Sequence, residues 1–238
     1  PFAHAHYYET SRRLRFITNM LLLFGGLNMN LRSIARYQSL YPPIRTHIIP
    51  LNYRHLWFSP RFDTIYKEAS INDNIHVHCL SGGVLQYTRF LRMYTEIADK
   101  VVTEVYDNPS HAEGVVNFIH QTTDFSPKIC KKMLKWWVPE PMEQSKYFLN
   151  HFPLTNARRL VIQSENDAIC PSEHIKDMID RWSIDNIWTN DCIHLHSLRK
   201  YPNIYKERII KTLQHPNDNT SFSGSSVRNK NIKIDAGK

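Results

Sequence analysis

Three residue types that together perform nucleophilic catalysis occur far apart in the sequence. Ser81 lies in "HVHCLSGGV", Asp167 ends the polar turn "SEND", and His194 lies in "DCIHLHS". A serine hydroxyl attacks an acyl carbon when a histidine accepts its proton and a carboxylate orients the imidazole ring. We therefore predict acyl-transfer chemistry at these residues, although each also fits an ordinary turn or loop position.

The residues around Ser81 are small enough for a sharp turn from a strand into a helix. Cys79 and Gly83 lie two positions to either side, so "CLSGG" meets the steric rule of the G-x-S-x-G elbow without its first glycine. In such a turn the backbone N–H of Gly82 would stabilise the developing oxyanion. The order Ser, Asp, His is also that of an α/β-hydrolase triad.

A second oxyanion donor is expected from the loop after the first strand. The segment "FGGLNMN" supplies the backbone amides of Gly26 and Leu27 there. Glycines follow strands in many α/β folds, so this signal is weak without the others.

Two further residues compete for the acid and base positions. Asp107 in "VYDNPS" is an alternative acid or pocket-lining residue, and His196 lies two residues beyond His194 in the same loop. Sequence alone leaves both alternatives open.

Metal chemistry is a weaker hypothesis, suggested by three H-x-H pairs: His4/His6, His76/His78 and His194/His196. Alternate residues of a strand share a face, so each pair could chelate an ion. No matched carboxylate cluster accompanies them, and we predict neither a metal nor another cofactor.

Six apolar runs alternate with segments of helical period along the chain. The runs are "LRFITNMLLLFGG", "THIIPL", "NIHVHCL", "KVVTEVYDNP", "RRLVIQSEND" and "NIWTNDCIH", and the expected helices span 30–41, 62–70, 83–99, 127–150, 172–182 and 202–214. This alternation predicts an α/β fold, a mostly parallel sheet with helices on both faces. The candidate residues follow the strands, at the edge where such folds bind ligands.

The chain divides into an N-terminal extension (1–14), an α/β domain (15–214) and a tail (215–238) whose composition predicts disorder. Residues from about 115 to 153 form the longest gap between strands and are expected to form a small helical cap. Aromatic residues in this segment favour an apolar acyl or lipid-like substrate, although such residues are more often core.

The amino-acid composition limits which binding partners and which cellular compartment are expected. The four cysteines show no C-x-x-C spacing, which fits reduced intracellular thiols, and no apolar stretch approaches the length of a membrane span. The net charge of +8 is compatible with peripheral membrane association. Nucleic-acid binding is disfavoured because no recognised motif accompanies the charge.

Three segments, "HCLSGGV", "SENDAICPSEHIKDM" and "HLHSLRKYPNIY", occur in the order of the motifs of the transmembrane protein 53-like family, also called domain of unknown function 829 and including PaxU-type proteins. The chain resembles this family from about Leu21 to Leu213. The matching positions are His78, Ser81, Asp107, Pro109, Asp167, His194, Leu198, Arg199, Tyr201 and Pro202. The resemblance implies an α/β-hydrolase fold, hydrolase activity and residence at the nuclear envelope or endoplasmic reticulum.

The elbow departs from the family pattern because it is one residue shorter. Aligned on Gly82 and Gly83, the family serine falls on Leu80, whereas aligned on His78 it falls on Ser81, the alignment we favour. Ser197 also replaces a family histidine. The shortened turn motivates a second hypothesis: a catalytically degraded protein of the same fold that regulates or binds a protein partner.

Overall fold

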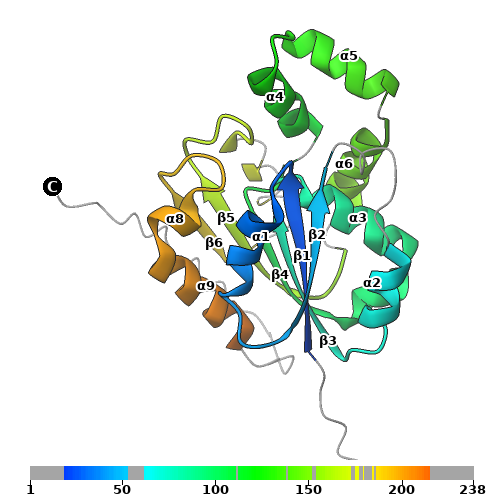
Figure 1. The fold of residues 1–238 in the computed structure, drawn as a ribbon, viewed down its shortest axis with the longest axis vertical. Helices are drawn as coiled ribbons and strands as arrows, with labels where there is room; N and C mark the ends of the chain where they lie inside the picture. Colours follow the sequence, from blue (N-terminus) through cyan, green and yellow to red (C-terminus); the bar gives the residue numbers. More distant parts are fainter. Residues whose placement is uncertain are drawn as a thin grey trace, which may run out of the picture.

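A parallel six-stranded sheet forms the centre of the protein in a computed structural model (Figure 1). The structure describes residues 19–52, 62–110, 112–137, 139–151, 154–172, 175–176, 179, 184 and 186–214. The strands lie in the order β2-β1-β3-β4-β5-β6, and all the neighbouring pairs are parallel. Their bounds are β1 (Asn19–Leu27), β2 (Arg45–Leu51), β3 (Asn74–Leu80), β4 (Val101–Asp107), β5 (Arg158–Ser164) and β6 (Ile187–Asn190).

Helices cover both faces of this sheet because the central strands are apolar on both sides. In β1, Leu22 packs into the core under α2 (Phe62–Ala69) and α3 (Gly83–Met93), and Leu23 packs into the core under α1 (Leu31–Gln38) and α9 (Pro202–Gln214). Such two-sided burial is typical of parallel sheets. The predicted fold class is confirmed.

The remaining helices follow β4 and β6 in the chain. After β4 come α4 (Ala112–Thr122), α5 (Pro127–Trp137) and α6 (Pro139–His151), and after β6 comes the short α8 (Ser197–Lys200). Figure 1 shows α4 and α5 projecting beyond the edge where the strands end, while α6 lies beside α3. The expected cap segment is therefore helical.

The observed element bounds differ from the sequence expectations in four places. Gly26 and Leu27 are the last residues of β1 rather than a following loop, and the β1–β2 register shifts between Phe24 and Leu27. The expected helix 83–99 ends at Met93, and a separate 3₁₀ helix (Thr95–Lys100) follows it. The expected helix 127–150 is two helices. Residues 112–122, before it, form a helix that the pattern did not separate.

Local chemistry explains two of these differences. The ring of Tyr94 stacks on Tyr66 at 4.4 Å and its hydroxyl donates to Asp63 at 2.5 Å, so contacts with α2 hold Tyr94 outside helical dihedral angles. Pro139 begins α6, and proline has no N–H to continue the preceding helix. Most of the expected helix 172–182, the N-terminal extension and the tail lie outside the described residues.

Candidate active site

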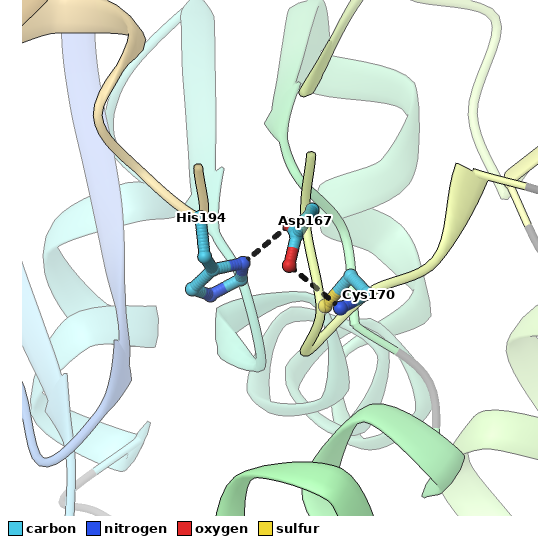
Figure 2. A group of neighbouring side chains, drawn as sticks. All are labelled: Asp167, Cys170 and His194. Atoms are coloured by element: carbon cyan, nitrogen blue, oxygen red, sulfur yellow. Dashed lines mark hydrogen bonds and ion pairs between the residues drawn. The ribbon is translucent and has the colours of Figure 1, made fainter. Parts of the chain in front are cut away.

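Ser81, His194 and Asp167 form a continuous chain of hydrogen bonds at the carboxyl edge of the sheet. His194 Nε2 lies 2.8 Å from Ser81 Oγ, and His194 Nδ1 lies 2.6 Å from Asp167 Oδ2. Figure 2 shows the imidazole of His194 facing the carboxylate of Asp167. Three segments that follow β3, β5 and β6 thus bring together the serine, acid and histidine predicted from sequence.

Ser81 occupies the apex of a tight turn between β3 and α3. Its backbone φ is 50°, a left-handed conformation that is costly for a residue other than glycine, asparagine or aspartate. The turn is fixed from two sides: Ser81 N–H donates to the carbonyl of Asp107 at 2.9 Å, and Ser110 N–H donates to the carbonyl of Ser81 at 3.2 Å. Leu80 belongs to β3 and is buried in the core, so Ser81 takes the apex in this turn.

The backbone amides expected to face an oxyanion lie around this apex. Gly82 is the N-cap of α3, and a Cβ atom added to Gly82 would lie 4.0 Å from the backbone nitrogen of Leu27. A Cβ added to Gly26 would lie 3.1 Å from the Cβ of Ser81, so the end of β1 passes directly beside the serine. The N–H of Gly26 donates to the sulfur of Met29 at 3.3 Å. Of the three expected donors, the Gly26 N–H is therefore already engaged by the Met29 sulfur.

The carboxylate of Asp167 is buried and its oxygens are hydrogen-bonded. Oδ1 accepts from the backbone N–H groups of Ile169 and Cys170, both at 2.8 Å, and Oδ2 faces His194. Burial would raise the pKa of Asp167, but the hydrogen bond and electrostatic attraction of His194 and hydrogen bonds from the Cys170 N–H and the Asn108 side chain outweigh it and leave the pKa lowered. The ionised form needed to orient an imidazole is thus favoured.

The structure adds Asn108, which the sequence analysis did not identify. Its side-chain N–H donates to Asp167 Oδ2 at 2.5 Å, and its side-chain oxygen accepts from Ser164 at 3.2 Å. Ser164 in turn contacts Ser197, which is hydrogen-bonded to Asn190. The φ of 47° at Asn108 suits asparagine. Its place directly after Asp107 in "VYDNPS" was the one available signal.

Asp107, the alternative acid, faces a different partner. It is fully buried and its Oδ2 accepts from the hydroxyl of Tyr205 at 2.7 Å. Burial raises the pKa of Asp107 to about 7, an effect that the Tyr205 hydrogen bond opposes. Asp107 therefore lies next to the triad but is hydrogen-bonded to α9.

The two other histidines of interest lie away from the Ser81 hydroxyl. His196 is exposed and borders a surface cavity of about 400 Å³ that is lined by Asp191, Cys192, Ile193, His196, Arg199 and Lys200. His78 is buried between the hydroxyls of Tyr41 (3.0 Å) and Tyr205 (3.2 Å), and burial lowers its pKa to about 3. His78 is therefore neutral and structural.

Among the residues that the structure describes, one group of three potential metal ligands is found: Asp167, Cys170 and His194, with ligand atoms within 4.8 Å of one another (Figure 2). The hydrogen bonds of Asp167 to His194 and to the Cys170 N–H already account for this clustering. Within the described residues, neither His76/His78 nor His194/His196 forms a group of three potential ligands as a pair. His4 and His6 lie outside the described residues.

Comparison with solved structures identifies the fold. An esterase from Pyrococcus furiosus matches with a TM-score of 0.56 at 12% identity, covering 83% of this chain and 81% of that chain. An esterase from Thermogutta terrifontis matches with a TM-score of 0.54 at 15% identity, covering 82% of this chain and 89% of that chain. An α/β hydrolase from a Medee basin deep-sea metagenome library matches with a TM-score of 0.54 at 11% identity, covering 84% of this chain and 90% of that chain.

The chain therefore has the α/β-hydrolase fold, and identities this low show the fold alone. No protein-family model and no curated protein matches the sequence, so the resemblance to the transmembrane protein 53-like family stays a prediction. Across the described residues, every helix is too short or too polar to cross a bilayer.

Proposed function

We propose that this protein is a serine hydrolase that cleaves an ester or similar acyl bond. The observation that carries the proposal is the hydrogen-bonded chain from Ser81 Oγ through His194 to Asp167. Nucleophile, base and acid are each within hydrogen-bonding distance of the next group, which is the geometric requirement for an activated serine. The α/β-hydrolase fold and the esterases that share it support the same chemistry.

In this mechanism Ser81 Oγ attacks the acyl carbon while His194 Nε2 accepts the hydroxyl proton. Asp167 holds the proton on His194 Nδ1 and stabilises the imidazolium that forms. The amides of Gly82 and Leu27 donate to the oxyanion, and His194 then protonates the departing alcohol. Water, deprotonated by His194, releases the acid and restores Ser81.

For the substrate we propose a small acyl or lipid-like ester. The expected cap, α4 to α6, follows directly in the chain from the Asp107–Ser110 segment that supports the Ser81 turn, which supports a role of the cap in binding the acyl group. The side chains of Trp136 and Trp137, which motivated this substrate class from sequence, lie outside the described residues. Residence at the nuclear envelope or endoplasmic reticulum, implied by the family resemblance, is part of the same proposal.

A fluorophosphonate probe tests the proposal directly, because it reacts much faster with an activated serine than with an ordinary one. We expect labelling at Ser81, identified by peptide mapping, and hydrolysis of p-nitrophenyl esters. Ser81→Ala should abolish labelling and lower kcat about 10³-fold or more. The exposed Ser39→Ala is the matched control and should change neither.

Absence of labelling in folded protein, beside a labelled control hydrolase, would contradict the proposal. That result would favour the second hypothesis, a regulatory or protein-binding role on a degraded hydrolase fold.

A further inference from the structure

Helix α5 carries a strongly basic outer face. Four of its eleven residues are lysines (Lys128, Lys131, Lys132 and Lys135), and it contains no acidic residue. At 100° per residue these four positions fall within about one third of the helix circumference. All four are exposed, whereas Cys130, on another side of the helix, is fully buried.

Two exposed apolar side chains adjoin this basic face. Ile129 is 48% exposed and lies one turn from Lys132 on the helix surface, and Phe125 in the preceding loop is 45% exposed. The loop is held in place because the carbonyl of Phe125 accepts from the ring of His120 on α4 at 2.8 Å. Lysines beside exposed apolar groups are typical of helices that lie in a membrane interface.

The helix pair α4–α5 is fastened to the loop that carries the catalytic acid. The side chain of Asn117 donates to the carbonyl of Ile169, and that of Gln121 donates to the carbonyl of Ala168, both at 3.2 Å. Gly114 allows close contact, since a Cβ there would lie 3.2 Å from the sulfur of Cys170. In Figure 1, α5 is the outermost helix beyond the edge of the sheet that bears the triad.

We propose that α5 docks the protein on an anionic phospholipid bilayer, with its lysines against the headgroups and Phe125 and Ile129 inserted between them. The combination of lysines and exposed apolar side chains favours a membrane over other anionic partners. Phosphate-rich nucleic acid would attract the lysines but offers no apolar phase for two large exposed side chains. Docking by α5 would hold the edge that contains Ser81 close to the membrane surface.

Vesicle co-sedimentation tests this proposal without relying on catalysis. Wild-type protein should bind phosphatidylcholine vesicles containing about 30% phosphatidylserine, and raising NaCl from about 0.1 to about 1 M should weaken binding as charges are screened. Pure phosphatidylcholine vesicles should bind much less. Lys128→Glu/Lys132→Glu should lower the partition coefficient about 30-fold or more, because each lysine near an anionic surface contributes roughly fivefold.

The chain offers matched controls for both kinds of contact. Lys206→Glu/Lys211→Glu makes the same charge change on exposed residues of α9 and should leave vesicle binding within about threefold of wild type. Phe125→Ser/Ile129→Ser should lower binding, whereas Ile71→Ser/Met93→Ser removes apolar groups elsewhere that are at least as exposed and should not lower it. Circular dichroism melts verify that each variant is folded.

Equal vesicle binding by wild type and both α5 variants would overturn the proposal, as would failure of folded wild type to bind anionic vesicles. Binding to RNA that is lost in Lys128→Glu/Lys132→Glu, without vesicle binding, would assign the basic face to nucleic acid instead. Because Ser81 labelling is measured separately, loss of docking and loss of catalysis are distinguishable.

Discussion

The side-chain amide of Asn108 donates to the same Asp167 oxygen that faces His194, at 2.5 Å and 2.6 Å respectively. Asn108 follows β4 and Asp167 follows β5, so the contact joins the ends of two neighbouring strands. With Oδ1 held by two backbone amides, the carboxylate has little freedom to rotate. Asn108 is therefore a positioning residue for the proposed acid.

Asn108→Gly should lower kcat about 10-fold or more while leaving the backbone intact, since glycine accepts the φ of 47°. Loss of this donor should also raise the pKa of Asp167 from its lowered position, because one bond that favours the carboxylate is gone. Protonation of Asp167 would then begin at higher pH. The pH profile of kcat should lose activity on its acid side earlier than the wild-type profile does.

Ser164→Ala is the control for this experiment. It removes a hydrogen bond to Asn108 but leaves the donor to Asp167 in place. It should preserve the shape of the pH profile. A uniform fall in kcat with an unchanged acid limb in Asn108→Gly would show that the contact only supports the fold.

Much of the fold could be predicted because its strands are short apolar runs that end in polar residues. The run "NIHVHCL" matches β3 residue for residue, and β5 is the first seven residues of the run "RRLVIQSEND". Helix ends were less predictable where tertiary contacts decide them, as at Tyr94, whose ring stacks on Tyr66. The helix at residues 112–122, which contains Gly114, was not recognised as separate from α5.

The site was predictable where residue type alone limits the choice. Few serines, acids and histidines follow buried strands, and the order of Ser81, Asp167 and His194 narrows them further. Asn108 was not predictable because its role depends on two left-handed turns and on the pairing of β4 with β5. The choice between Ser81 and Leu80 at the elbow likewise required the backbone path.

Gly83→Ala should destabilise the protein because the new methyl group would meet backbone that cannot move alone. A Cβ at Gly83 would lie 2.4 Å from the carbonyl oxygen of Phe24 in β1. We expect the free energy of unfolding to fall by about 1–3 kcal/mol, measured by urea denaturation. Gly82→Ala is the comparison, since the nearest atom to its Cβ would be in the Leu51 side chain, at 3.2 Å, and the nearest backbone atom would lie at 4.0 Å. Equal effects of the two changes would contradict this explanation.

Asp107→Asn should remove a pH dependence of stability. Because the folded pKa is raised to about 7 from 3.8, chiefly by burial, the folded state holds a proton between about pH 4 and 7 that the unfolded state has lost. The wild-type free energy of unfolding should therefore decrease as pH rises through this window, by on the order of 4 kcal/mol in total. Asparagine stays neutral, so urea unfolding of the variant should lack this decrease. Parallel curves for the two proteins would contradict the prediction.

Substitution of Cys170 tests whether the nucleophile is the Ser81 oxygen or the Cys170 sulfur, because the two side chains are hydrogen-bonded to each other. Burial raises the pKa of Cys170, and hydrogen bonds with Ser110 and Ser81 only partly oppose that effect. The thiol therefore stays protonated at neutral pH, and a protonated thiol is a poor nucleophile and a poor metal ligand. Cys170→Ala and Cys170→Ser should keep fluorophosphonate labelling at Ser81 and ester hydrolysis within about threefold of wild type, provided packing adjusts around the smaller groups.

Iodoacetamide supplies the complementary measurement on the unmodified chain. Cys170 is 3% exposed, so folded protein should resist alkylation there and unfolded protein should react. Rapid alkylation of Cys170 in folded protein, accompanied by loss of ester hydrolysis that Cys170→Ala escapes, would show that the sulfur reaches the acyl site. Loss of hydrolysis in a folded Cys170→Ala variant that still labels at Ser81 would instead assign the acyl transfer to the thiol.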